Sequence, residues 1–284
     1  MFGVNRQVYY RRIRSVKQRK SRALKVIELV ESIRIQMPKI GARKLYFLLQ
    51  KELRSMNVGR DMLFRILKSN HMLITPKRSY HITTNSHHRF RKHKNLIENV
   101  VPEKPEQIWV SDITYVGNRA NPMYLSLVTD AYSKRIMGHD VSNSLDVSGS
   151  IRALKMAVKK RAYKNNKIIH HSDRGLQYCS NEYQDLLKKS NMNCSMTESY
   201  DPYANAVAER VNGILKAEFI GYKNKCSLQT MEKLINNSIA VYNERRPHFS
   251  CFYKTPKQMH LQNEIKIKTY KKQNLPVNKC LLGD

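Results

Sequence analysis

The chain has 284 residues, 41% hydrophobic and 26% charged, which is enough apolar material for a folded core in one large or two ordinary domains. Its 52 Lys and Arg outnumber 22 Asp and Glu, and the net charge of +30 indicates a polyanionic partner, nucleic acid above all. No apolar run approaches the ~18 residues of a membrane span, no signal-peptide pattern is present, and the five scattered cysteines lack C-x-x-C spacing. We therefore expect a cytoplasmic protein and exclude secreted, membrane-spanning and disulfide-stapled classes.

The positive charge is concentrated near the N-terminus. Residues 1–100 contain 24 basic and 5 acidic side chains, whereas the other 184 residues contain 28 and 17. Solubility alone does not require charge to be sorted by segment, so we expect the N-terminal third to hold nucleic acid. The acidic residues lie mainly in the later part of the chain, where a metal site would need them.

Helical periodicity is the main pattern of the N-terminal third. Residues 11–20 are a charge run with little to bury, and a first helix is predicted to begin at Ser21. Further helices are predicted over residues 42–53 and 60–69, joined by a tight glycine-containing turn. This arrangement matches a helix-turn-helix, whose second helix would enter a DNA groove, and equally matches an ordinary three-helix bundle. The residues here that we expect to contact DNA are Arg43, Lys44, Arg60 and Arg65.

Residues 75–104 are predicted to be a basic linker, because prolines and a polar run leave few apolar anchors. Four histidines lie in it: His81, His87, His88 and His93. The first 100 residues contain no cysteine, so a zinc module of two histidines and two cysteines is absent. We interpret these histidines as solvated or phosphate-facing.

After the linker, the pattern changes to that of an α/β domain. Apolar, β-branched and aromatic runs predict strands, and longer amphipathic stretches predict helices. The expected elements are a three-stranded antiparallel meander over 108–116, 124–129 and 135–141, a helix over 144–163, a short strand over 167–171 and a helix over 205–219.

Three acidic residues are notable for their places in these elements. Asp112 interrupts an apolar strand, where an unpaired charge is costly. Asp173 follows a strand at a glycine turn, and Glu209 shares a helix face with Asn212 and Lys216. Taken singly, each acid is more often an ordinary hydrogen-bond acceptor or an exposed residue. Together they can hold Mg²⁺ or Mn²⁺, which prefer carboxylate oxygens, and two such ions ~4 Å apart serve phosphoryl transfer.

Five segments carry a family resemblance: 109–115 (WVSDITY), 171–178 (HSDRGLQY), 205–216 (NAVAERVNGILK), 242–248 (YNERRPH) and 255–256 (TP). They resemble the integrase-type catalytic core of bacterial insertion-sequence transposases, specifically the OrfB product of the insertion-sequence-three family. Thirty-five residues separate Asp173 from Glu209, and Lys216 follows Glu209 by seven, as in the family's pattern. The N-terminal third is similar too, so the resemblance covers nearly the whole chain. It implies a ribonuclease-H-like α/β core, a mixed five-stranded sheet flanked by helices, with an all-α N-terminal helix-turn-helix-like domain.

The resemblance also implies a reaction, that of a DDE transposase, a metal-dependent polynucleotidyl transferase. Asp112, Asp173 and Glu209 would be the catalytic and metal-binding triad, with two Mg²⁺ or Mn²⁺ ions. Water would free a 3′-hydroxyl at the element end, and this hydroxyl would attack a second phosphodiester without a covalent protein intermediate. The residues expected to contact DNA in this part of the chain are Lys216, Arg210, Asn212, His171 and Gln177. Residues 242–248 either contact DNA or form a helix terminus stopped by Pro247.

The partners implied are double-stranded DNA, at the element ends and the target, and further copies of the chain. The chain begins at a segment that lies near the start of OrfB-type proteins, and the family's main end-recognition module belongs to an upstream reading frame. We therefore expect a homo-oligomer on DNA in the bacterial cytoplasm, at the nucleoid and away from membranes, acting with the OrfA protein or fused to it. The expected regions are DNA-binding helices over 1–74, the linker over 75–104, the catalytic core over 105–263 and a basic tail over 264–284.

Two other functions are open at this point. A non-catalytic DNA-binding relic or regulator would keep the fold and the charge, although the presence of all three acids favours the enzyme. A cellular ribonuclease H is disfavoured by the basic helical extension and by residues 242–256.

Overall fold

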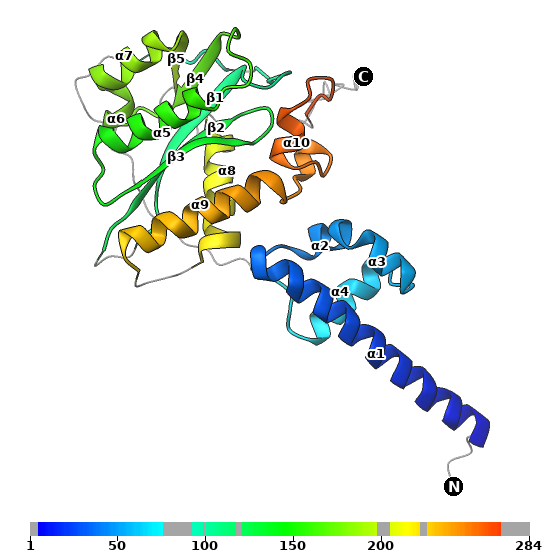
Figure 1. Cartoon of the computed structure of the whole chain (residues 1–284). Coiled ribbons are helices and arrows are strands. Elements are labelled where there is room, and N and C mark those ends of the chain that lie inside the picture. Colours follow the sequence, from blue (N-terminus) through cyan, green and yellow to red (C-terminus); the bar gives the residue numbers. More distant parts are fainter. Residues whose placement is uncertain are drawn as a thin grey trace, which may run out of the picture.

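Figure 1 shows a computed structural model of the chain, which describes residues 5–75, 93–98, 100–117, 121–197, 205–221 and 226–267. The N-terminal part contains helices only, and an α/β part follows it. Three of the linker histidines and most of the expected C-terminal tail lie outside the described residues. No helix in the described ranges combines the length and apolarity needed to cross a membrane. The described cysteines, Cys179, Cys194, Cys226 and Cys251, are free thiols.

The N-terminal part consists of α1 (Arg6–Gln36), α2 (Ala42–Leu48), α3 (Gln50–Ser55) and α4 (Arg60–Ser69). The first helix does not begin at Ser21 but at Arg6, where the Asn5 side chain accepts a hydrogen bond from the Gln7 backbone N–H at 3.0 Å. Lys, Arg and Gln are good helix formers, so the charge run continues the helix without core contacts. The helix predicted over 42–53 is divided at Leu49, and the third helix has the predicted bounds.

Five strands form a single sheet: β1 (Ile108–Tyr115), β2 (Tyr124–Asp130), β3 (Ile136–Ser142), β4 (Ile168–Ser172) and β5 (Met192–Met196). Their order is β3-β2-β1-β4-β5, with β1–β3 antiparallel and with β4 parallel to both β1 and β5. The antiparallel meander and the mixed five-stranded sheet are therefore confirmed. β5 was not predicted individually, because its sequence MNCSM has little β-branched or aromatic character.

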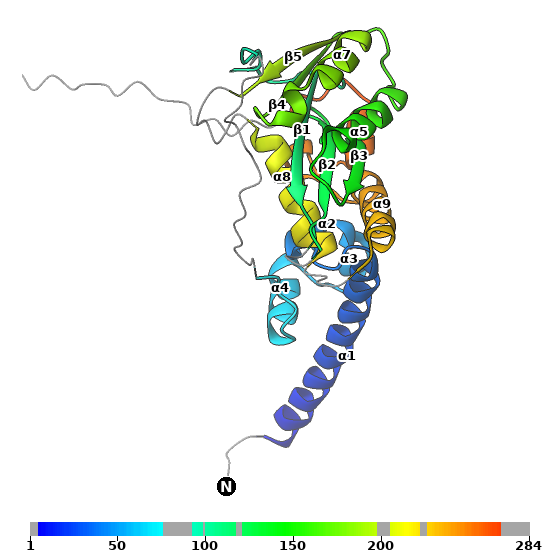
Figure 2. The same cartoon turned by 90° about the vertical axis from the view of Figure 1, so that its left-hand side faces the viewer.

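Helices cover both faces of the sheet, as Figure 2 shows for α5 and α8. One face carries α5 (Val147–Lys159), α6 (Leu176–Cys179) and α7 (Asn181–Lys189), and the other carries α8 (Ala206–Ile214), the π-helical segment η1 (Leu215–Ile220) and α9 (Leu228–Glu244). Side chains alternate along a strand, so Trp109 and Ile113 pack toward α5 and α7, and Ile108 and Val110 toward α8. Asp112 lies two residues after Val110 on the same strand, so its side chain is on the same face of the sheet as Val110, the face that α8 covers.

The N-terminal helices and the α/β part share one hydrophobic core. Val30 of α1 and Leu63 of α4 belong to the same buried cluster as Leu127 of β2, Ile214 of α8 and Ile235 of α9. Because these side chains are buried together, the helical part is packed on the α8 side of the sheet and is not merely tethered to it.

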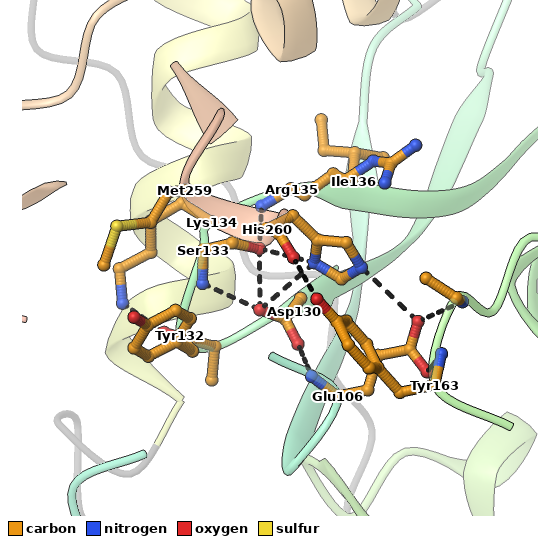
Figure 3. Close-up of polar contacts among 12 residues, drawn as sticks. Glu106, Asp130, Tyr132, Ser133, Lys134, Arg135, Ile136, Tyr163, Met259 and His260 are labelled. Atoms are coloured by element: carbon orange, nitrogen blue, oxygen red, sulfur yellow. Dashed lines mark hydrogen bonds and ion pairs between the residues drawn. The ribbon is translucent and has the colours of Figure 1, made fainter. Parts of the chain in front are cut away.

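A buried polar cluster holds the last helix, α10 (Pro256–His260), to the β2–β3 hairpin (Figure 3). Asp130 Oδ1 accepts hydrogen bonds from the backbone N–H and the hydroxyl of Ser133, both at 2.7 Å, and Oδ2 accepts one from the Glu106 backbone N–H at 2.7 Å. His260 Nδ1 lies 3.0 Å from Ser133 Oγ, and its Nε2 lies 3.4 Å from Glu106 Oε1. Burial lowers the pKa of His260, but the bonds to Asp130 and Glu106 outweigh burial and raise it. Asp130 is thus an anchor of the fold.

Candidate active site

The register of the central strands brings Asp112 and Asp173 together. β1 and β4 run parallel, with Ser111 opposite Ser172. Asp112 follows Ser111 within β1, Asp173 follows Ser172, the last residue of β4, and neighbouring strands lie about 4.8 Å apart. Two carboxylates from distant segments therefore lie side by side at the C-terminal end of β4.

One face of α8 lies along β1 and holds Asp112 in place. Asn212 Nδ2 donates a hydrogen bond to Asp112 Oδ2 at 2.7 Å, and the Ile113 backbone N–H donates to Oδ1 at 2.9 Å. At the start of the helix, Asn205 Nδ2 donates to the Ser111 carbonyl oxygen at 3.1 Å. With both of its oxygens engaged, the Asp112 carboxylate has a defined orientation.

Glu209 of α8 and Lys216 of η1, the π-helical segment that continues α8, belong to the same site. Lys216 Nζ donates to Thr114 Oγ1 of β1 at 3.1 Å, so this ammonium lies beside the strand that carries Asp112. Glu209 is exposed in the first turn of α8. The face shared by Asn212 and Lys216, predicted from their spacing, is confirmed by their bonds to a single strand.

Negative charge accumulates at Asp112. Burial raises the pKa of this carboxyl, and the charge of Asp173 raises it further. The bonds from Asn212 and Ile113 lower the pKa, the charge of Glu209 raises it, and the result is about 7. The raised pKa shows that negative charge is unfavourable at Asp112, because two other carboxylates act on it. A cation bound here would be stabilised by all three.

The donor set fits a hard divalent cation, since all three candidate ligands are carboxylates. In the described ranges, no three His, Cys, Asp or Glu side chains are gathered closely enough to hold a metal ion as they stand. The three acids therefore interact through their charges without meeting at ligand distance. Like charges repel, so three carboxylates approach further only around a cation.

Asp112→Asn is expected to stabilise the metal-free protein. A carboxyl whose pKa rises from 3.8 to about 7 on folding costs nothing below pH ~4, and its cost grows as the pH rises toward 7 and is constant above. Asn keeps the shape and removes the charge, so the melting temperature at about pH 8 should rise by ~2–4 °C for each kcal/mol recovered. Thermal unfolding with a chelator present measures this, with the exposed Asp185→Asn as control. An unchanged melting temperature would show that Asp112 carries no such cost.

The structure corrects two of the predicted DNA contacts. His171 is fully buried, with Nδ1 2.9 Å from Ser195 Oγ, so its side chain cannot reach DNA. Asn212 is 4% exposed and donates to Asp112, so it positions a carboxylate instead of contacting DNA. Gln177 is half-buried, and its Nε2 donates to the Leu145 carbonyl oxygen at 2.6 Å. For Gln177 the DNA contact stays a prediction.

A buried imidazole supports β1 next to Asp112. His170 Nε2 lies 2.8 Å from Ser111 Oγ and 3.0 Å from Tyr183 Oη. Burial lowers the pKa of His170 to about 3, so the ring is neutral at physiological pH. Sequence reasoning missed this cluster, because only the fold brings its three members together.

Glu218 of η1 is the centre of a buried ion cluster. Arg246 Nε donates to Oε2 at 2.8 Å and Arg246 Nη2 to Oε1 at 2.7 Å, while Lys44 Nζ of α2 donates to Oε1 at 2.9 Å. On its other side, Arg246 Nη1 lies 2.8 Å from His248 Nε2. The Glu218 cluster, formed by Lys44, Glu218, Arg246 and His248, joins the N-terminal helices to η1, which directly follows α8 and its Glu209.

The Glu218 cluster settles two sequence predictions. Lys44 is held by Glu218, with 20% of its side chain exposed, and is therefore not available for the DNA contact predicted for it. Tyr242, Arg246 and His248 are buried, and α9 ends before Pro247, so residues 242–248 do form a helix terminus. A DNA contact by the exposed Arg245 of this segment stays a prediction. Of the remaining predicted DNA contacts, Arg43, Arg60, Arg65 and Arg210 are exposed, and Lys216 is half-buried.

Comparison with known proteins matches this site to two family models. Both are described as an integrase core domain, and they match residues 102–202 and 190–256. The chain is 31% identical over 253 residues to an uncharacterised 31 kDa protein of insertion element IS600 from Shigella sonnei, which covers 87% of this chain and 92% of that protein. It is 30% identical over 217 residues to a predicted transposase of insertion sequence element IS986/IS6110 from Mycobacterium tuberculosis, with 74% and 77% covered.

A solved structure shares the fold. A chain of the simian T-cell lymphotropic virus intasome, solved in complex with the PP2A regulatory subunit B56 gamma, aligns with a TM-score of 0.50 at 20% identity. The alignment covers 81% of this chain and 78% of that chain. At this identity the likeness concerns the fold alone, and it agrees with the ribonuclease-H-like expectation.

Proposed function

Since the chain belongs to the insertion-sequence transposases that carry an integrase core domain, we propose that Asp112, Asp173 and Glu209 are its metal-binding catalytic residues. The protein is a polynucleotidyl transferase, and its reaction is DNA strand transfer in transposition. The observation that supports the residue assignment is the parallel register of β1 and β4, in which Ser111 and Ser172, the residues before Asp112 and Asp173, lie opposite each other. Strand transfer from DNA that carries the element ends, with Mg²⁺ and the upstream-frame protein added, tests the assignment.

Two Mg²⁺ or Mn²⁺ ions are the cofactors that this donor set favours. When bound, such ions activate the attacking oxygen and stabilise the leaving oxygen of a phosphodiester. The support in this chain is the set of three hard carboxylate donors together with the raised pKa of Asp112.

The chain's own residues prepare the site for DNA. Asn212 and the Ile113 backbone N–H present the Asp112 carboxylate in one orientation. Lys216, held by Thr114, supplies a positive charge beside the carboxylates, where it can contact a phosphate of the reacting strand. Burial lowers the pKa of Lys216, and the charge of Asp112 raises it in part.

Asn212→Ala is expected to lower strand transfer by about 10–100-fold, because partners that orient metal ligands contribute on this scale. The loss should be accompanied by a higher Mg²⁺ concentration at half-maximal rate, while DNA binding stays unchanged. Single-turnover strand transfer over a Mg²⁺ series measures both quantities. The exposed Asn193→Ala is the matched control. If both variants kept the wild-type Mg²⁺ dependence, Asn212 would have no role in orienting Asp112.

Each region of the chain has its own role in this proposal. Residues 1–74 hold DNA, with α4 in the position of a recognition helix, and residues 75–104 link them to the catalytic core over 105–263. The basic tail over 264–284 adds to DNA affinity. The active form is an oligomer on double-stranded DNA, at the nucleoid, working with the OrfA protein or fused to it.

A further inference from the structure

A basic groove lies on the N-terminal helices, away from the carboxylates. One wall is α1, the other is the end of α3 with the turn after it, and the volume is about 630 Å³. Four cations line it: Arg14, Lys17, Arg22 and Lys25. The opposite wall contributes polar groups of Ser55 and Asn57, and none of the lining residues is acidic.

The four cations form a single stripe along α1. Positions 14, 17, 22 and 25 are spaced i, i+3, i+8 and i+11, which places them on one face of a helix. At 1.5 Å per residue the stripe is about 16 Å long. Each strand of duplex DNA presents a phosphate about every 3.4 Å of helix axis. A stripe of this length therefore faces several consecutive phosphates of one strand.

Within the described part of the chain, the stripe has no ion-pair partner. Between Arg6 and Lys25 there are nine basic residues and no acidic one. Among the described residues, none of the four cations takes part in an ion pair. The N-terminal end of α1 extends away from the α/β part of the molecule (Figures 1 and 2), and the facing wall of the groove, Ser55 to Asn57, carries no acidic residue. Like charges three residues apart repel, a cost that an anionic partner removes.

Lys44 of the Glu218 cluster is paired with a carboxylate inside the protein, unlike the lysines of the groove. Lys44 of α2 is half-buried against the α/β part and bonded to Glu218 at 2.9 Å. Lys17 and Lys25 of α1 are exposed to solvent. The α2 side of the N-terminal helices is thus used for docking onto the core, and the α1 groove is left for an external ligand.

We propose that this groove binds the sugar–phosphate backbone of duplex DNA, as a holding site distinct from the catalytic carboxylates. The proposal rests on the proposed function, because it names a DNA-contacting surface for the same reaction. Contacts of this kind position DNA without reading its sequence. The groove thereby adds affinity and orientation, and sequence selection comes from elsewhere.

The test is the salt dependence of binding of the full chain to a duplex of arbitrary sequence. Each phosphate contact contributes about 0.9 to the slope of log affinity against log salt. Lys17→Gln/Lys25→Gln should therefore reduce the magnitude of the slope by about 1.8. Gln is a good helix former and both positions are exposed, so the melting temperature should stay unchanged.

A matched variant removes two charges elsewhere. Lys20→Gln/Lys155→Gln alters another face of α1 and an exposed position of α5, and it should keep the wild-type slope. An unchanged slope in the groove variant, or an equal fall in both variants, would overturn the proposal. An unchanged slope with loss of an oligomer in sedimentation would instead assign the groove to a second copy of the chain. Asp173→Asn should bind with the wild-type slope, and if it retained strand transfer, the proposed function would fail while the groove assignment stood.

Discussion

Asp173→Asn is expected to lower strand transfer by about 10³-fold or more, because a ligand to the reacting centre contributes ~4 kcal/mol or more of transition-state stabilisation. The substitution keeps the shape of the side chain, including the Oδ1 that accepts from the Gly175 backbone N–H at 3.0 Å. Fold and DNA affinity should therefore be retained. Strand transfer under single-turnover conditions, normalised to bound DNA, measures the loss.

The control for this prediction is Asp185→Asn, an exposed aspartate of α7 whose ion pair with Lys188 lies on the surface. It should be as active as the wild type. If Asp173→Asn matched it in rate, the chain's reaction would not depend on the Asp173 carboxylate. A non-catalytic DNA-binding protein, the alternative considered from the sequence, would show no strand transfer in any variant and unchanged binding in all.

Glu218→Gln is expected to destabilise the protein by about 3–5 kcal/mol, since it leaves the Arg246 guanidinium buried without its countercharge. Burial raises the pKa of Glu218, but Arg246 and Lys44 outweigh burial and hold it below its usual range. The stability gained from this carboxylate is therefore present above its unfolded pKa of about 4.5 and is lost as the pH falls through the lower folded value. Denaturant unfolding between about pH 3 and pH 7 measures both effects.

Two further variants separate the charge from the packing. Glu218→Met/Arg246→Met replaces the pair by apolar side chains of similar length and should recover much of the loss. Glu244→Gln breaks an exposed pair with Lys257 and should leave stability unchanged. Stability of Glu218→Gln equal to that of Glu244→Gln would mean that the Glu218 cluster does not anchor η1.

Local sequence patterns predicted the elements that carry the site. The strand runs around Asp112 and before Asp173 have the β-branched and apolar character of buried strands, and both form as expected. The i, i+3 and i+7 spacing of Glu209, Asn212 and Lys216 predicted a common helix face, because helical geometry alone sets it. The register that makes the two aspartates neighbours depends on pairing across 60 intervening residues, and no local pattern contains it.

The predicted DNA contacts that are wrong concern polar side chains that form hydrogen bonds inside the protein. His171 and Asn212 lie in motif segments and carry groups typical of DNA contacts, yet both are buried and bonded within the protein. Whether a polar residue faces DNA or a buried partner depends on tertiary contacts that spacing does not reveal. The start of α1 was misplaced for a different reason: helix propensity extended it beyond the residues that have anything to bury.

The most direct test of the account is strand transfer by Glu209→Gln, measured beside the wild type in Mg²⁺ and in a chelator. Glu209 is the exposed member of the three carboxylates, and its charge reaches Asp112 in the folded chain. Joined DNA product is expected only from the wild type and only with the metal present. Wild-type rates from Glu209→Gln, or product formed in the chelator, would contradict a reaction carried by three carboxylates and a divalent cation.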